Sequence, residues 1–89
     1  DYDDVAALSA FADSCDVITY EFENVPVAPL RVIEEGATIR PNIRALEIAQ
    51  DRVEEKNFAS ALGGRTAKFA TVTSPEDAAA ALDTVGYPA

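Results

Sequence analysis

Two carboxylates and one amide come directly after a short apolar run near the start of the chain. The run Val17–Tyr20 suits a buried β-strand, and Glu21, Glu23 and Asn24 follow it. If the chain stays extended for two further residues, Glu21 and Glu23 lie on one face and Phe22 packs on the other. Two acids on one face could hold a cation, an amine or ribose hydroxyls. A solvated strand end, with Asn24 making a turn, is the competing and more common interpretation.

A second candidate is Arg52, which lies in the segment QDRVEEK from Gln50 to Lys56. Its guanidinium is a permanently charged fork that suits a nucleotide phosphate. Arg52 and Lys56 are four residues apart, so on a helix these like charges lie together and repel each other. We interpret this pattern as indicating an external anion. An arginine that only covers a helix surface is the alternative.

Alternating helices and strands are expected to position these residues. Apolar residues at helical spacing follow Asp3 or Asp4, either of which can cap a helix. The strand 17–20 comes next, followed by a helix over 26–36 that begins with proline, and by a short strand over 38–40. Because the connection between the two strands is short and contains a helix, we expect them to be parallel in an α/β arrangement.

The second half of the chain continues the alternation. A short helix is predicted after Asn42, and another after Asp51, ending at the glycines 63–64. We expect this second helix to bury the apolar side chains Val53, Phe58 and Leu62. A third strand is predicted over 69–72. Ser74 then caps a final helix whose first position is Pro75.

The composition excludes several classes of partner. The 89 residues include 16 acidic and 7 basic side chains, for a net charge of −9. Nucleic acid and anionic membranes both need a basic footprint, so we expect neither as a partner. No apolar run approaches the length of a membrane span. Much of the apolar content is alanine, which predicts a thin core.

Cysteine and histidine content limits the possible chemistry. Cys15 is the single cysteine and the chain has no histidine, so a Cys–His nucleophile is impossible within it. A free thiol fits a reducing, cytoplasmic location. No metal-ligand spacing is present, so we expect no metal site in this chain.

Three motifs, in order and at matching spacing, carry a family resemblance. They are TYEFENVP (19–26), RPNIRALEIAQDRVEEKNF (40–58) and the T-A-x-F segment at 66–69. Together they resemble the 5-(carboxyamino)imidazole ribonucleotide synthetases, which are ATP-grasp enzymes of purine biosynthesis. Two departures occur, because the family's G-I-P-T is here Gly63-Gly64-Arg65-Thr66 and Lys68 replaces a proline. Losing both prolines loosens the linker before the predicted third strand.

The resemblance implies a fold and an activity. Residues 1–41 would be the end of a Rossmann-like pre-ATP-grasp domain with a parallel sheet, and 42–89 would be connecting helices and the start of an ATP-grasp domain. Such ligases form carboxyphosphate from ATP and bicarbonate and carboxylate aminoimidazole ribonucleotide. They use ATP with Mg²⁺ and are commonly homodimers. The chain would be an internal piece, inactive and marginally stable by itself.

The resemblance also assigns residue roles. Glu21 matches the carboxylate that contacts the ribonucleotide, and Arg52 matches the arginine that contacts ATP, whereas Glu23 is expected to be structural. Catalytic residues and Mg²⁺ ligands would lie outside this chain. Two other functions stay open: a formate-dependent glycinamide ribonucleotide transformylase of the same superfamily, and a non-catalytic α/β interaction module.

Overall fold

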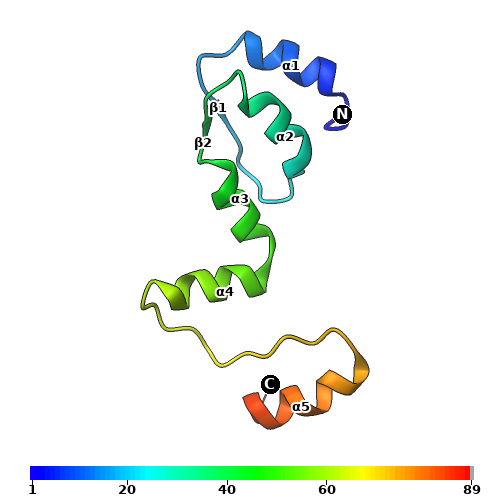
Figure 1. Ribbon diagram of the computed structural model, residues 1–89, viewed down its shortest axis with the longest axis vertical. Helices are drawn as coiled ribbons and strands as arrows, with labels where there is room; N and C mark the ends of the chain where they lie inside the picture. Colours follow the sequence, from blue (N-terminus) through cyan, green and yellow to red (C-terminus); the bar gives the residue numbers. More distant parts are fainter. Residues whose placement is uncertain (89) are drawn as a thin grey trace. The chain divides into compact units, whose positions relative to one another are not determined.

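The structure, a computed structural model, describes residues 1–88 and contains two compact units. One unit runs from Asp1 to Glu55 and the other from Lys56 onward. Figure 1 shows that helices and short strands alternate in the first unit, whereas the second contains an extended segment followed by a helix. The helix α4 (Arg52–Ala61) supplies residues to both units.

The first unit is built around two parallel strands. It contains α1 (Val5–Asp13), β1 (Ile18–Thr19), α2 (Val27–Glu34), β2 (Ile39–Arg40) and α3 (Ile43–Gln50), followed by the start of α4. In the pair, Ile18 lies opposite Ile39 and Thr19 opposite Arg40. Helix α2 connects the two strands, as a parallel pair requires. The predicted α/β class is confirmed.

Side-chain caps begin the helices where the sequence predicts. The Asp4 carboxylate accepts a hydrogen bond from the main-chain N–H of Ala7 at 3.0 Å, which caps α1. The Asn42 side chain accepts one from Ala45 at 2.9 Å, which caps α3. Each cap satisfies a donor that the first helical turn leaves unpaired.

The core of the first unit is one apolar cluster that draws on every element up to α3. Its buried members are Ala12, Ile18, Val25, Leu30, Ile33, Ile39, Ile43 and Leu46. Ile39, Ile43 and Leu46 are the most completely enclosed, at 1–2% exposed. Ile43 and Leu46 are three residues apart, so they share the face of α3 that packs inward.

The strand predicted over 17–20 is shorter than expected. Only Ile18 and Thr19 pair, and Val17 is 59% exposed. The partner strand β2 ends where Pro41 follows, and proline has no N–H to continue a ladder. The chain therefore bends at Glu21 and turns near Glu23, so the expected common extended face does not form.

The last helix of the second unit has a defined cap at each end. Its last helix, α5 (Pro75–Val85), is capped by Ser74, whose Oγ accepts from the N–H of Asp77 at 3.2 Å. Gly86 ends α5 with a φ of +81°, a conformation that glycine adopts without a side-chain clash. Both predicted ends of this helix are confirmed.

Two expectations for the second half of the chain are wrong. Residues 69–72 are extended but pair with no strand among residues 1–88. Helix α4 buries none of its residues, and Phe58 and Leu62 are 50% and 74% exposed. An apolar stripe becomes buried only where another element presents an apolar face to it. The alanine-rich α5, which also buries no residue, supplies no such face.

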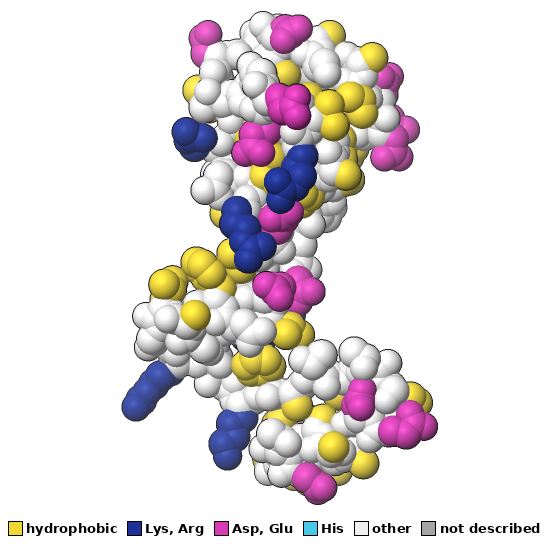
Figure 2. All heavy atoms as spheres, in the orientation of Figure 1, with side chains coloured by type: hydrophobic (Ala, Val, Ile, Leu, Met, Phe, Trp, Pro, Cys, Tyr) yellow, Lys and Arg dark blue, Asp and Glu magenta, His cyan; other side chains and the backbone are white. Residues whose placement is uncertain are grey.

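The surface carries mixed charge, and no helix of the described chain is suited to a bilayer. Figure 2 shows acidic side chains scattered over the face in view, interrupted by a few basic ones. Within residues 1–88, none of the helices is long and apolar enough to cross a membrane.

Candidate functional site

Glu21 lies just beyond the carboxyl end of β1 and is exposed. It borders a hollow of about 250 Å³ whose lining is mostly apolar. The lining comprises Tyr2, Leu8, Phe11, Ile18, Thr19, Tyr20, Glu21, Phe22, Val25, Leu30 and Ile33. Residues 18–22 contribute consecutively, so the hollow follows β1 and the three residues after it. Phe22, expected to pack on the face opposite Glu21 and Glu23, is 65% exposed here.

A tyrosine ties the end of β1 to the start of α3. The Tyr20 hydroxyl donates a hydrogen bond to the main-chain carbonyl of Asn42 at 3.1 Å. Asn42 also caps α3, so one residue connects the strand end to the helix start. The position of α3 relative to the segment that carries Glu21 is thereby defined at its first turn.

The last residue of α3 holds the turn that follows Glu21. The Gln50 side-chain amide donates to the carbonyl of Glu23 at 2.7 Å and to the carbonyl of Val25 at 2.6 Å. These partners lie 27 and 25 residues earlier in the chain. Sequence reasoning did not single out Gln50, because a glutamine at a helix end carries no sign of a distant main-chain partner.

Arg52 and this turn line a common cleft. The cleft has a volume of about 470 Å³ and is lined by Glu23, Asn24, Pro26, Ala49, Gln50 and Arg52. Its lining combines a carboxylate, two amides and a guanidinium, which can bind hydroxyl, amine and anionic groups. Glu21 and Glu23 therefore border different hollows, and it is Glu23 that shares one with Arg52.

Arg52 has a partner within its own helix, contrary to the pairing expected from the sequence. Its guanidinium donates to the Glu55 carboxylate at 2.5 Å, a pair spaced i,i+3, while 79% of the side chain is exposed. The sequence argument considered only i,i+4 spacing, and residues three apart also lie side by side on a helix. The inference that Arg52 lacks a local counter-charge is wrong.

Asp51 positions Arg52 at the start of α4. Its carboxylate accepts from the N–H groups of Val53 and Glu54 at 2.8 and 3.1 Å, so the predicted N-cap is confirmed. Glu54 does not return a bond to Asp51 but lies 3.9 Å from the Arg44 guanidinium. Arg52 is thus the first residue of a capped helix, directly after the α3–α4 junction.

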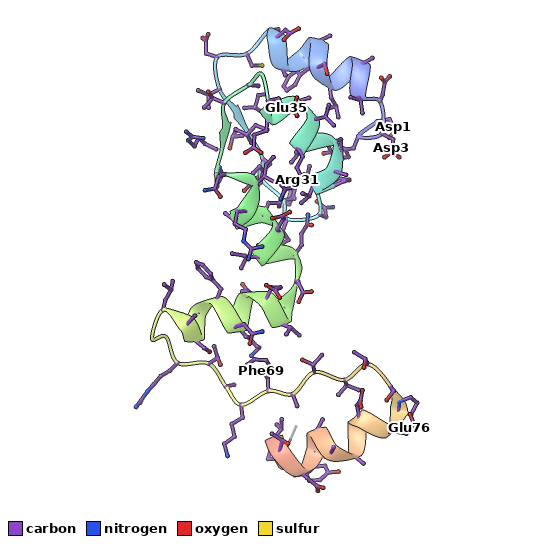
Figure 3. All side chains as sticks on the ribbon, viewed as in Figure 1. Asp1, Asp3, Arg31, Glu35, Phe69 and Glu76 are labelled. Carbon is purple, nitrogen blue, oxygen red and sulfur yellow. The ribbon has the colours of Figure 1, made fainter. Side chains whose placement is uncertain are left out.

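Lys56 has an aromatic neighbour in the second unit. Its ammonium nitrogen lies 5.2 Å from the centroid of the Phe69 ring, a cation–π arrangement. Phe69 is labelled in Figure 3 on the extended segment after α4. The Lys56 ammonium therefore has a local aromatic contact.

Metal-binding groups do not cluster in the described chain. Among residues 1–88, no set of three or more histidine, cysteine, aspartate or glutamate side chains is arranged to hold a metal ion. Cys15 is a free, half-buried thiol in contact with the core cluster.

Comparison with known proteins gives a family match. Residues 1–50 match the ribonucleotide synthetase preATP-grasp domain. Among curated proteins, the N5-carboxyaminoimidazole ribonucleotide synthase of Brucella melitensis is 47% identical over 85 residues, which is 96% of this chain and 24% of that protein. The first curated relatives are matched over 9–24% of their length, so the chain spans at most about a quarter of them.

Solved structures agree with the sequence matches. The N5-carboxyaminoimidazole ribonucleotide synthetase of Thermus thermophilus superposes with a TM-score of 0.92 at 44% identity, covering 99% of this chain and 24% of that one. The synthase from Aspergillus clavatus, solved with ADP and 5-aminoimidazole ribonucleotide, gives a TM-score of 0.81 at 25% identity, covering 96% and 23%. The resemblance carried by the three sequence motifs is confirmed.

Proposed function

The chain belongs to the ribonucleotide synthetase preATP-grasp domain family, and we propose that it is part of an ATP-dependent ligase that carboxylates aminoimidazole ribonucleotide. In this reaction bicarbonate attacks the terminal phosphate of ATP, giving carboxyphosphate and ADP. The carboxyl group then passes to the exocyclic amine of the ribonucleotide and phosphate leaves. The product is 5-(carboxyamino)imidazole ribonucleotide.

The observation that carries this proposal is the match in backbone over nearly the whole chain to a synthetase of that name. The TM-score of 0.92 and 44% identity cover 99% of the chain. The chain covers only 24% of that synthetase, so we place the activity in a longer polypeptide that would contain this chain. This chain would then contribute binding groups, with catalytic residues and the ligands of Mg²⁺ elsewhere.

Two side chains have proposed roles in binding. Glu21 would accept hydrogen bonds from the ribonucleotide, because a carboxylate at the carboxyl end of a parallel strand lies where α/β folds bind ligands. Arg52 would contact the phosphates of ATP from the cleft it shares with Glu23, where 79% of its side chain is accessible.

We propose the domain layout and cellular context on the same basis. Residues 1–41 would complete the pre-ATP-grasp domain, and 42–89 would provide connecting helices and the start of the ATP-grasp domain. The full-length enzyme would be a cytoplasmic homodimer that uses ATP and Mg²⁺. It would bind neither nucleic acid nor membrane.

The test is ADP formation by the full-length enzyme that contains this chain. With ATP, Mg²⁺ and bicarbonate present, aminoimidazole ribonucleotide should stimulate ADP release at least tenfold. Stimulation by glycinamide ribonucleotide with formate instead would assign the chain to the formate-dependent transformylase. No response to either nucleotide would contradict a ligase function and favour a non-catalytic module.

A further inference from the structure

The hydrogen bonds of Gln50 join two segments with separate proposed binding roles. One is the turn 21–25 after β1, which carries Glu21, and the other is the junction between α3 and α4, which carries Arg52. Both bonds come from the same side-chain nitrogen. A carbonyl can only accept, so both partners require the donor end of the amide, and the orientation of Gln50 follows from the chemistry.

The turn has one further anchor in the core. The side chain of Val25 is 7% exposed and belongs to the apolar cluster, which holds the last residue of the turn. Glu21, Phe22, Glu23 and Asn24 are all exposed. The bond from Gln50 to the Glu23 carbonyl is therefore the contact that restrains the middle of the turn.

Helix α3 is also held at other points, so Gln50 is not needed to dock it. Tyr20 bonds to Asn42 at its start, and Arg31 of α2 forms an ion pair with Glu47 on its second turn. Arg31 is labelled in Figure 3, where its side chain extends from α2 toward α3. Loss of the Gln50 bonds would free the turn without releasing the helix.

We propose that Gln50 is a positioning residue that holds the turn after β1 against the α3–α4 junction. It fixes the ribonucleotide-binding carboxylate of Glu21 relative to the nucleotide-binding guanidinium of Arg52. The inference rests on the proposed function for the identity of the two ligands. Its structural part, the restraint of the turn by two donated hydrogen bonds, does not depend on any ligand.

The donor chemistry of the two Gln50 hydrogen bonds predicts which replacements of Gln50 keep the turn restrained. Gln50→Ala removes the donor, and Gln50→Glu keeps the shape but places a carboxylate against two carbonyl oxygens. Gln50→Lys keeps a donor group on a flexible stem long enough to reach both carbonyls. Arg31→Ala is the matched control, because it removes a different contact of α3 and leaves the turn untouched.

The experiment measures the affinity of the full-length enzyme for aminoimidazole ribonucleotide and for ADP by calorimetry. Gln50→Ala and Gln50→Glu should weaken ribonucleotide binding at least fivefold, whereas Gln50→Lys and Arg31→Ala should stay within twofold of the wild type. Combining Gln50→Ala with Glu21→Gln should weaken binding little beyond Glu21→Gln alone, because positioning acts through Glu21. Equal losses in the Ala and Lys variants, or fully multiplicative losses in the double variant, would overturn the inference.

A ligand-free measurement separates this inference from the proposed function. A glutamate-specific protease cleaves after exposed, mobile glutamates, and the turn carries Glu21 and Glu23. Cleavage after Glu23, mapped by mass spectrometry, should accelerate at least fivefold in Gln50→Ala and Gln50→Glu but not in Gln50→Lys. If wild-type enzyme binds no aminoimidazole ribonucleotide, the proposed function fails. Accelerated cleavage in the variants would still support restraint of the turn by Gln50. Unchanged cleavage in every variant would overturn the inference that Gln50 restrains the turn.

Discussion

The guanidinium of Arg52 donates a hydrogen bond to the carboxylate of Glu55 at 2.5 Å, one turn further along the same helix. Arg52 also lines the cleft that contains Glu23, and 79% of its side chain is exposed. A phosphate that approaches from the cleft would therefore meet a cation that already has a partner. If Arg52 binds the nucleotide as proposed, Glu55 would compete with the nucleotide for the Arg52 guanidinium.

Replacing Glu55 should strengthen nucleotide binding. In Glu55→Gln the competing charge is lost, and ADP affinity of the full-length enzyme should rise about two- to fivefold, since an exposed ion pair is worth about that factor. Arg52→Ala should lower ADP affinity at least tenfold, or about 1.4 kcal/mol. Calorimetric titration with ADP measures both. Unchanged affinity in Arg52→Ala would remove Arg52 from the nucleotide site.

Replacing Glu21 should affect the ribonucleotide and not the nucleotide. Glu21→Gln keeps the size of the side chain but loses the charge that strengthens accepted hydrogen bonds. We expect the KM for aminoimidazole ribonucleotide to rise about tenfold, with the KM for ATP within twofold of the wild type. Steady-state ADP release at varied concentrations of each substrate separates the two constants. The matched control is Glu35→Gln, at an exposed position after α2, which should leave both constants unchanged.

Two leucines should differ sharply in their contribution to stability. Leu46 is 1% exposed in the core and Leu62 is 74% exposed, so Leu46→Ala should lower the free energy of unfolding by about 2–5 kcal/mol. Leu62→Ala should change it by less than about 0.5 kcal/mol. Urea unfolding of the full-length protein that contains this chain, followed by circular dichroism, measures both. Similar losses would contradict the exposed position of Leu62 directly after α4.

Asp77 should make the start of α5 sensitive to acid. Hydrogen bonds from the Thr73 hydroxyl, at 2.7 Å, and from the Thr73 N–H, at 3.2 Å, lower the pKa of the Asp77 carboxyl below its usual range. The pKa of Asp77 is lower in the folded chain than in the unfolded chain. Its contribution to the stability of the fold is therefore complete above the unfolded pKa of about 3.9. It is lost as the pH falls through the folded pKa.

The variant that tests this relationship is Thr73→Val, which removes the hydroxyl but keeps the shape. The pKa of Asp77, followed by the carboxyl carbon shift in an NMR titration, should move up toward its ordinary value. Thr84→Val is the control, since the Thr84 hydroxyl donates to the carbonyl of Ala80 instead. A pKa of Asp77 that responds equally to both variants would contradict the assigned cause.

Local sequence was enough to predict the helices and their starts. The caps at Asp4, Asn42, Asp51 and Ser74 all form as expected. A cap joins a side chain to an N–H two or three residues later, so every atom involved lies within one short segment. The helical and strand periods act over similarly short distances, and the parallel α/β class followed from the order of these elements.

Candidate site residues were predictable by type but not by arrangement. Glu21 was recognisable as a carboxylate at a strand end, and Arg52 as a cation at a helix start. Their surroundings were not, because β2 is only two residues long and the chain turns after β1 as soon as pairing stops. That turn directs Glu21 and Glu23 to different hollows.

Sequence alone determined the family and the class of fold, and it named Glu21 and Arg52 as the residues for which we propose binding roles. Only the tertiary structure decided that Gln50 holds Glu23 and Val25, that Arg52 pairs with Glu55, and that α4 stays exposed. The contacts of Gln50 span 25 and 27 residues. Burial likewise depends on which faces meet in space, and neither property is encoded in a local pattern of residue types.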